Sequence, residues 1–138
     1  VEDNADVVRY LLACVEPEYR TVVATHGREG VTLAVEHTPD LIISDVMMPV
    51  MDGFELCRQA KTDPRTSHIP IILLTAKSDT DSKLEGLHQG ADAYLGKPFD
   101  KRELLVRIQK LLELRRNLQT HYASLLGTPE HTTNQLSA

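Results

Sequence analysis

The sequence predicts an α/β fold built around a doubly wound parallel sheet. Short apolar runs alternate along the chain with segments of helical period, which is the pattern of strand–helix–strand crossovers. Two of the runs, 41–43 and 69–74, are continuously apolar, as expected for parallel strands that are covered on both faces. In such a fold, functional groups gather at the carboxyl ends of the strands.

The predicted strands are runs of three to six residues, rich in β-branched or aromatic side chains, that end in turn or polar residues. Val1 is expected to be the last residue of a first strand. The four later runs then bring the predicted sheet to five strands, and they lie at 21–24, 41–43, 69–74 and 91–95.

The predicted helices lie between these runs and show apolar residues at helical spacing. Asp100, with Glu103 three residues later, is typical of a helix start, and this last helix continues far beyond it. The helix at 79–89 is weak, because Leu84 and Leu87 are its only large apolar residues. The other helical segments are expected near 8–15, 31–35 and 52–60.

Length, composition and charge narrow the class of protein. A chain of 138 residues with 41% hydrophobic and 25% charged residues fits one domain with a real core. A formal net charge of −5 argues against a surface made to grip nucleic acid. Cys14 and Cys57 form no CxxC motif and fit a reducing compartment. No apolar run approaches the ~20 residues needed to span a bilayer.

Polar groups follow four of the predicted strands at the point where each strand ends. Glu2 and Asp3 follow Val1, Asp45 follows the run at 41–43, and Thr75 and Lys97 follow the last two runs. If these strands are parallel neighbours, three carboxylates, a hydroxyl and an ammonium meet at one edge of the sheet. Taken singly, each has a simpler explanation, such as a helix cap or a solvated loop residue.

Three carboxylates held close together repel one another, so the cluster needs a cation. Oxygen ligands without His or Cys suit Mg²⁺, which joins carboxylates to a phosphate. Lys97 would supply a point charge for that phosphate, and Thr75 a hydrogen bond. Asp45 at the centre would be the nucleophile that forms an aspartyl-phosphate by in-line phosphoryl transfer.

These residues resemble the receiver (response-regulator) domain of bacterial two-component signalling. The resemblance spans positions 1 to about 115, in the family's order and spacing, and implies a flavodoxin-like (βα)5 fold. It rests on the runs VEDN (1–4), PDLIISDVMMP (39–49), MDGFEL (51–56), IPIILLTA (69–76), GADAYL (90–95) and KPF (97–99).

The resemblance implies that Asp45 accepts a phosphoryl group from the phosphohistidine of a histidine kinase. Glu2 and Asp3 would bind Mg²⁺ together with Asp45 and the backbone carbonyl of Met47, and a Glu-Asp pair is an accepted variant in the family. As an isolated domain, such a protein catalyses only its own phosphorylation and dephosphorylation.

The resemblance also implies the switch that follows phosphorylation. Thr75 would shift toward the phosphoryl group, and Tyr94 would rotate inward behind it. Lys97 would pair first with the carboxylate and then with the phosphoryl oxygens, and the bond before Pro98 is usually cis in the family. The added charge favours the arrangement with Thr75 and Tyr94 drawn in.

The last helix is predicted to continue past the receiver, which we assign to 1–117, into a helical extension and disordered linker at 118–138. A heptad-like seam favours a dimerising helix that leads to an output domain, and a helix that folds back on its own domain is the alternative. The seam consists of Leu111, Leu114, Leu118, His121 and Leu125. Arg115 and Arg116 are interpreted as a solvated face.

The composition of 110–116 is similar to receivers inside hybrid sensor kinases that carry a DNA-binding module further on. The partners implied are a histidine kinase or phosphotransfer domain and an output domain in the parent chain. The receiver itself is expected to contact neither nucleic acid nor membrane. A cytoplasmic location is expected, with an inner-membrane anchor of the parent left open, and the kinase, stimulus and output are not indicated.

The chain opens on Val1-Glu2-Asp3 without an initiator Met, so we expect it to be cut from a longer protein. Residues of the first strand are expected to exist in the protein or to come from a neighbouring copy. A chain that truly began at Val1 is expected to fold poorly, because the strand is interior to the sheet.

Three other functions are weaker. A haloacid-dehalogenase-type phosphatase needs a second Asp two residues after the nucleophile, where this chain has Met47. A flavodoxin-like cofactor carrier needs a Gly-rich loop that binds phosphate, and this sequence has no such loop. A histidine phosphotransfer domain is a helical bundle, which the strand runs oppose.

Overall fold

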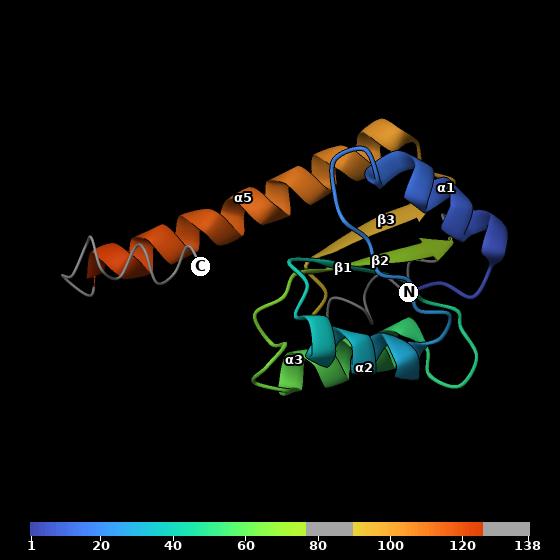
Figure 1. The fold of residues 1–138 in the computed structure, drawn as a ribbon, viewed down its shortest axis with the longest axis horizontal. Coiled ribbons are helices and arrows are strands. Elements are labelled where there is room, and N and C mark those ends of the chain that lie inside the picture. Colours follow the sequence, from blue (N-terminus) through green and yellow to red (C-terminus); the bar gives the residue numbers. More distant parts are fainter. Residues whose placement is uncertain (77–89, 126–138) are drawn as a thin grey trace.

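The computed structural model describes residues 1–76 and 90–125 of the chain. Its elements run in the order α1, α2, β1, α3, β2, β3 and α5 (Figure 1). The helices are α1 (Ala5–Val15), α2 (Gly27–His37), α3 (Gly53–Thr62) and α5 (Lys101–Leu125), and the strands are β1 (Ile42–Asp45), β2 (Ile71–Ala76) and β3 (Ala93–Lys97). The predicted helix at 79–89 lies outside the described residues.

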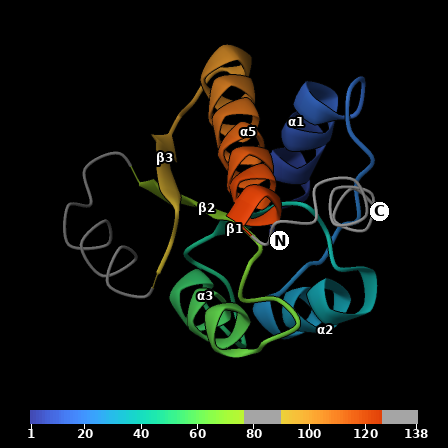
Figure 2. The ribbon, with the colours of Figure 1, turned by 90° about the vertical axis from the view of Figure 1, so that its left-hand side faces the viewer.

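The strands of the described residues form a parallel sheet in the order β1-β2-β3, with helices on both faces. α1 and α5 cover one face, and α2 and α3 cover the other (Figure 2). The sheet side chains alternate between the two resulting cores: Ile71 and Leu73 pack toward α2 and α3, whereas Ile72 and Leu74 pack toward α1 and α5. All four are fully buried, which confirms the prediction of a parallel sheet covered on both faces.

Val1 and Glu2 extend the ladder of the sheet beyond β1. The amino group of Val1 donates to the carbonyl of Ile43, and the N–H of Asp45 donates to the carbonyl of Val1. On its other side, the N–H of Glu2 donates to the carbonyl of Ala24. These bonds place Val1–Glu2 between residue 24 and β1, so the spatial order is 21–24, 1–2, β1, β2 and β3.

The run at 21–24 is not a strand among the described residues, contrary to the prediction. Its one main-chain bond to the sheet is the one that Ala24 accepts from Glu2. A strand is stabilised by a ladder of bonds along its length, and one main-chain bond does not form such a ladder. Val22 and Val23 are consequently exposed.

Two strands begin two residues later than expected, at Ile71 and Ala93. Pro70 has no N–H to donate, so the ladder of β2 starts at Ile71. The N–H of Ile71 donates to the Asp92 carboxylate at 2.8 Å, and that carboxylate also pairs with Lys61 at 2.9 Å. These side-chain contacts hold the amino ends of β2 and β3 together with a main-chain bond, which the N–H of Asp92 donates to the carbonyl of Ile71 at 3.0 Å.

The helices begin at side-chain caps that satisfy their first N–H groups. The Asn4 carboxamide accepts from the N–H groups of Asp6 and Val7, so α1 begins at Ala5, ahead of the apolar stripe at 8–15. The Asp100 carboxylate accepts from the N–H of Glu103 at 2.7 Å, which confirms the predicted start of α5.

α5 continues as one helix to Leu125 and projects past the body of the domain (Figure 1). Leu104 and Ile108, in its first half, are buried against the sheet. Arg115 donates to the backbone carbonyl of Asp40 at 2.9 Å and fastens the helix where it leaves the sheet. Within the described residues, no helix is both long and apolar enough to cross a bilayer.

Candidate phosphoacceptor and metal site

The candidate site is centred on Asp45, the last residue of β1. Its N–H is held by the Val1 carbonyl, and its Oδ1 accepts from the N–H of Val46 at 3.0 Å. The residue is only 8% exposed. Two main-chain contacts therefore fix the carboxylate at the carboxyl end of the sheet, as the prediction requires.

Lys97, the last residue of β3, reaches two of the carboxylates. Its Nζ lies 3.0 Å from Asp45 Oδ1 and 3.4 Å from Glu2 Oε1. Partial burial disfavours the charged ammonium, but the hydrogen bonds and charges of Asp45 and Glu2 outweigh it and raise the pKa of Lys97. The Lys97–Pro98 peptide bond is cis, as the resemblance implies.

Glu2 is the most buried carboxylate of the cluster, with 2% of its side chain exposed. Burial, the hydrogen bond to Asp45 and the charge of Asp45 together raise the pKa of Glu2 from 4.5 to about 7, and Lys97 offsets only part of this. Glu2 Oε2 is buried and has no hydrogen-bond partner in the described part of the chain. A buried carboxylate oxygen without a donor is energetically unfavourable, and a cation bound to this atom would relieve that cost.

Asp3 completes the acidic cluster and is exposed. One carboxylate oxygen from each of Glu2, Asp3 and Asp45 lies within 4.8 Å of the other two. Such an all-oxygen donor set suits a hard cation such as Mg²⁺. The unpartnered Oε2 of Glu2 points to the same conclusion, so the residues present fit a magnesium ion.

The structure places the remaining predicted residues around this edge. Thr75 is buried near the end of β2, in register with Gly96 of β3. Tyr94 is half-buried and packs against the core on the α2 and α3 side. Met47 follows Asp45 by two residues and its side chain is 77% exposed.

Sequence reasoning missed Gly53, which packs against the backbone of Asp45 and Val46. A Cβ on Gly53 would lie 2.3 Å from the backbone oxygen of Asp45 and 2.9 Å from the Cα of Val46, so only glycine fits. Its N–H donates to the Val46 carbonyl at 2.8 Å. The signal was the Gly that follows the capping Asp52, eight residues after the phosphoacceptor candidate.

Sequence reasoning also missed the backbone of Val50, in the loop between β1 and α3. Its φ is +69°, in the left-handed region that β-branched residues rarely adopt. Its side chain is 75% exposed. Burial of the side chain therefore does not explain the conformation, and no sequence pattern identifies it.

Comparison with known proteins agrees with the arrangement of the carboxylates and Lys97 at the end of the sheet. The family described as "Response regulator receiver domain" matches residues 1–109. The chain belongs to this family. A receiver fold is thereby established for the sequence, and the flavodoxin-like parallel sheet with helices on both faces is the fold of its structural neighbours.

Relatives of this receiver include both kinases and solved receiver domains. "Histidine kinase P4" of Formosa agariphila is 41% identical over 124 residues, which is 90% of this chain and 9% of that protein. The signal receiver domain of a signal transduction histidine kinase from Syntrophus aciditrophicus has a TM-score of 0.76 and 40% identity, and covers 82% of this chain and 86% of that one.

A third relative was solved with a metal. The receiver domain of sensor histidine kinase PA1611 from Pseudomonas aeruginosa PAO1 has a TM-score of 0.77 and 30% identity, and the match covers 82% of this chain and 93% of that one. That structure is described with a magnesium ion coordinated in the active-site cleft. The receiver described here has an acidic cluster of its own, formed by Glu2, Asp3 and Asp45.

Proposed function

We propose that this receiver takes a phosphoryl group from the phosphohistidine of a histidine kinase onto Asp45 and thereby switches a downstream output. The observation that carries the proposal is the position of Asp45: it ends β1, accepts from Val46 N–H and lies 3.0 Å from Lys97 Nζ, next to two further carboxylates. The Asp45 carboxylate is therefore held in place as a nucleophile, with the Val46 N–H and the Lys97 ammonium as hydrogen-bond donors beside it.

In the proposed reaction, a carboxylate oxygen of Asp45 attacks phosphorus as the bond from phosphorus to the histidine nitrogen breaks. The imidazole leaves with the electron pair of that bond, and Asp45 becomes an acyl phosphate. Lys97 would move from the carboxylate to the phosphoryl oxygens and stabilise their negative charge. Its present contact with Asp45 Oδ1 places it close enough to do so.

Glu2, Asp3, Asp45 and the backbone carbonyl of Met47 are the proposed ligands of Mg²⁺. When bound, the ion neutralises the carboxylates and withdraws charge from the phosphoryl oxygens. The buried Glu2 Oε2, which has no partner in the described residues, supports its role as a ligand. Asp3 adds an exposed carboxylate, so the site is open to solvent on that side.

Thr75 and Tyr94 are the proposed switch residues. Thr75 is buried near the end of β2, next to the strand that carries Tyr94 and Lys97. Tyr94 is half-buried, so an inward rotation would bury more of its ring. Added phosphoryl charge and acceptor oxygens would favour the state in which Thr75 donates to them.

Radiolabelled acetyl phosphate with Mg²⁺ tests the phosphoacceptor. We expect label on the parent chain, none after Asp45→Asn, and none in the parent when EDTA is present. Asp40→Asn is the matched control, because Asp40 flanks the opposite end of β1 and its side chain is 87% exposed. Unchanged labelling of Asp45→Asn would sink the proposal.

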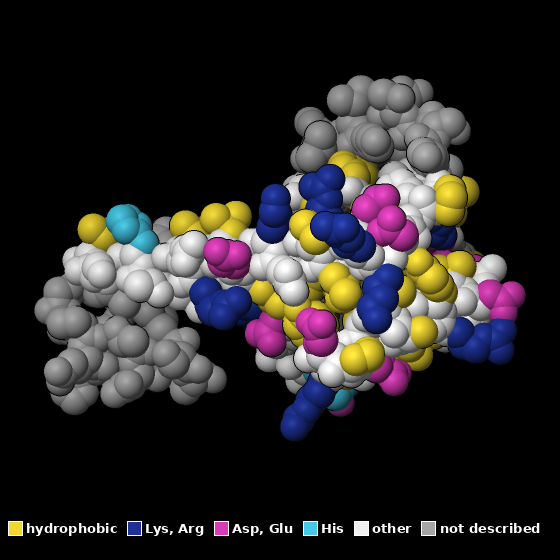
Figure 3. All heavy atoms as spheres, turned by 90° about the horizontal axis from the view of Figure 1, so that it is seen from above, with side chains coloured by type: hydrophobic (Ala, Val, Ile, Leu, Met, Phe, Trp, Pro, Cys, Tyr) yellow, Lys and Arg dark blue, Asp and Glu magenta, His cyan; other side chains and the backbone are white. Residues whose placement is uncertain are grey.

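We further propose that the receiver comprises 1–117 and that 118–138 links it to an output domain, with dimerisation through α5. The projecting part of α5 carries exposed hydrophobic side chains (Figure 3), including Leu114, Leu118 and Leu125 at 51–67% exposure. Their spacing fits a heptad seam. Leu111, at the start of the seam, already packs against the domain.

Sedimentation with and without beryllofluoride tests the dimer. We expect association that increases with beryllofluoride and is lost in Leu118→Glu. Asn117→Glu is the control, because it adds the same charge beside the seam. Association that is absent in both conditions, or equal in the two variants, would contradict the proposed interface.

The 41% sequence identity to a segment that makes up 9% of "Histidine kinase P4" supports the proposal that this receiver is part of a hybrid sensor kinase. The absence of contacts between the receiver and nucleic acid or membrane, and its cytoplasmic location, stay predictions.

A further inference from the structure

Tyr10 of α1 contacts the segment that joins β3 to α5, although 89 residues separate it from Phe99 in the sequence. Its hydroxyl donates to the backbone carbonyl of Phe99 at 3.0 Å. The two rings also pack together, with centroids 5.7 Å apart and planes tilted by 55°. Phe99 packs in turn against the core between the sheet and the helices α1 and α5. Phe99 is therefore held by a main-chain contact as well as by its ring.

The hydroxyl of Tyr10 keeps its proton at neutral pH and so remains a donor. Partial burial, the Cys14 thiol and the carboxylates of Asp100 and Glu103 raise the pKa of Tyr10 above the usual value for tyrosine. A phenol is uncharged below its pKa, so the contact with Phe99 is a neutral hydrogen bond. Its contribution to the free energy of unfolding is small, because Tyr10 is 44% exposed and water competes for the same groups.

Lys97 lies between two fixed points of the chain. The ladder between β2 and β3 runs as far as Lys97, which stands opposite Ala76. Two residues later, Tyr10 holds the carbonyl of Phe99. Pro98 between them is exposed and has no N–H, so it adds no main-chain donor at this point. The contact at Phe99 therefore restrains the chain directly after Lys97.

The position of the Lys97 backbone matters because its ammonium ends a flexible four-carbon side chain. Nζ lies 3.0 Å from Asp45 Oδ1 and 3.4 Å from Glu2 Oε1. A displaced backbone would allow the ammonium to favour Glu2 or solvent over Asp45, since the Lys97 side chain is 31% exposed. A group that stabilises a transition state loses much of its effect when it is misplaced by about 1 Å.

The same contact links the two segments that carry the opposite charges of the site. Glu2 and Asp3 lie directly before α1, whose first N–H groups are capped by Asn4. Lys97 lies directly before the loop that Tyr10 holds. Tyr10 therefore ties the helix that follows the carboxylates to the segment that follows the ammonium.

We propose that Tyr10 is a positioning residue for Lys97. Its hydrogen bond to Phe99 holds the chain that follows β3, and this keeps Lys97 Nζ against the oxygen of Asp45. Tyr10 acts through Lys97 and is not itself a catalytic residue. The consequence for phosphoryl transfer rests on the proposed function of Asp45, whereas the contact between Lys97 and Asp45 can be measured without a phosphoryl donor.

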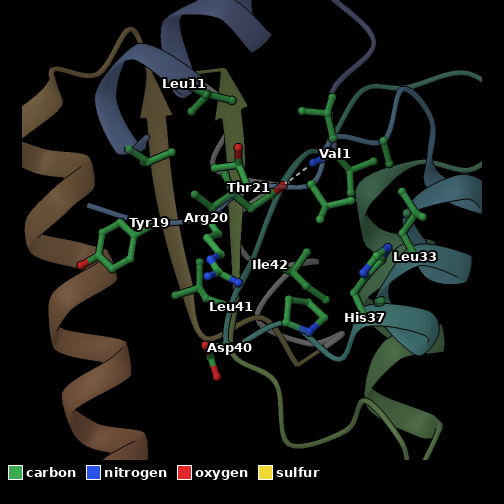
Figure 4. A pocket seen from close by; sticks show the side chains of 18 of the residues that line it. Val1, Leu11, Tyr19, Arg20, Thr21, Leu33, His37, Asp40, Leu41 and Ile42 are labelled. Atoms are coloured by element: carbon green, nitrogen blue, oxygen red, sulfur yellow. Dashed lines mark hydrogen bonds between the residues drawn. The ribbon is translucent and has the colours of Figure 1, made fainter. Parts of the chain in front are cut away.

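Tyr10→Phe tests the proposal in the intact chain, because it removes the hydroxyl and keeps the ring beside Phe99. Tyr19→Phe is the matched control. Tyr19 lines the pocket beside β1 (Figure 4) and packs against the same core, and its hydroxyl has no hydrogen-bond partner among residues 1–76 and 90–125. The rate of labelling by radiolabelled acetyl phosphate with Mg²⁺ is the measurement.

We expect Tyr10→Phe to be labelled about two- to tenfold more slowly than the parent, which is the range by which one lost hydrogen bond shifts an equilibrium. Tyr19→Phe should be labelled at the rate of the parent. The Mg²⁺ concentration that gives half of the maximal rate should be the same in all three chains, because each keeps the proposed metal ligands. The midpoint of urea denaturation should also change little.

Lys97→Gln separates a positioning role from a merely structural one. Without the ammonium, Tyr10 has nothing left to position, so Tyr10→Phe should leave the labelling rate of a Lys97→Gln chain unchanged. Two independent effects would instead multiply. Equal slowing by Tyr10→Phe in both backgrounds, or no slowing in the parent, would overturn the proposal.

The two Hε protons of Lys97 give a readout by NMR that needs no phosphorylation. They have distinct chemical shifts when the side chain is held in one geometry, and these shifts average when it rotates freely. We expect the separation to narrow in Tyr10→Phe and to persist in Tyr19→Phe, and an unchanged separation in Tyr10→Phe would also overturn the proposal. If the parent is never labelled, the proposed function of Asp45 fails, and this spectrum alone decides whether Tyr10 positions Lys97.

Discussion

Glu2→Gln is predicted to stabilise this receiver while it removes one of the proposed metal ligands. The neighbouring Asp45 and burial hold the pKa of Glu2 near 7, against 4.5 in the unfolded chain. That difference corresponds to about 3 kcal/mol at pH values above both. Gln has nearly the same shape but no charge, so we expect the free energy of unfolding to rise by about 2–3 kcal/mol at pH 8 without metal.

The pH dependence follows from the direction of the shift. The folded state holds the Glu2 proton more tightly than the unfolded state. The contribution of Glu2 to the free energy of unfolding is therefore fully present below pH 4.5 and is lost as the pH rises toward 7. The advantage of Glu2→Gln over the parent should therefore be small at pH 5 and reach its full value near pH 8.

Urea denaturation with EDTA at pH 5 and pH 8 measures this difference. Asp3→Asn is the control: it removes an exposed member of the same cluster and should change stability by less than about 0.5 kcal/mol. Added Mg²⁺ should stabilise the parent and not Glu2→Gln. A Glu2→Gln variant that is no more stable than the parent at pH 8 would refute the reasoning.

Three further substitutions test the support of the site. Gly53→Ala should destabilise by about 1–3 kcal/mol in urea and slow labelling of Asp45, because its Cβ would lie 2.3 Å from the Asp45 backbone oxygen. Lys97→Gln should slow labelling by acetyl phosphate at least tenfold while metal binding persists, and an unchanged rate would exclude the proposed role. Val50→Asn should raise stability by about 1 kcal/mol in urea, since Asn tolerates the left-handed φ of +69°; a loss would contradict strain there.

The parallel sheet and its functional edge could be predicted from the sequence because they follow from local patterns. Continuous apolar runs identify covered strands, and the residue after each run must lie at the carboxyl edge. Asp45 and Lys97 meet at 3.0 Å for this reason. The Asp100 cap is equally local, since it depends on the N–H of Glu103 three residues later.

The features that the sequence did not reveal depend on contacts between distant segments. Residues 21–24 have strand-like composition, yet a strand depends on a ladder of bonds to a neighbour, and this run makes one main-chain bond to the sheet within the described residues. Gly53 has a spatial constraint that appears only when Asp45 lies against α3. The positive φ of Val50 runs against the preference of a β-branched residue, so local propensity does not predict it.

The unequal surroundings of the carboxylates would let one cluster combine the proposed nucleophile with the proposed cation site. Asp45 has two donors on one oxygen, the Val46 N–H at 3.0 Å and Lys97 at 3.0 Å, so its position is set without a metal. Glu2 has a 3.4 Å contact with Lys97 on one oxygen and no partner in the described residues on the other. The unfavourable energy of bringing the carboxylates together is therefore concentrated on Glu2, and a cation bound there would relieve it without displacing the donors that orient Asp45.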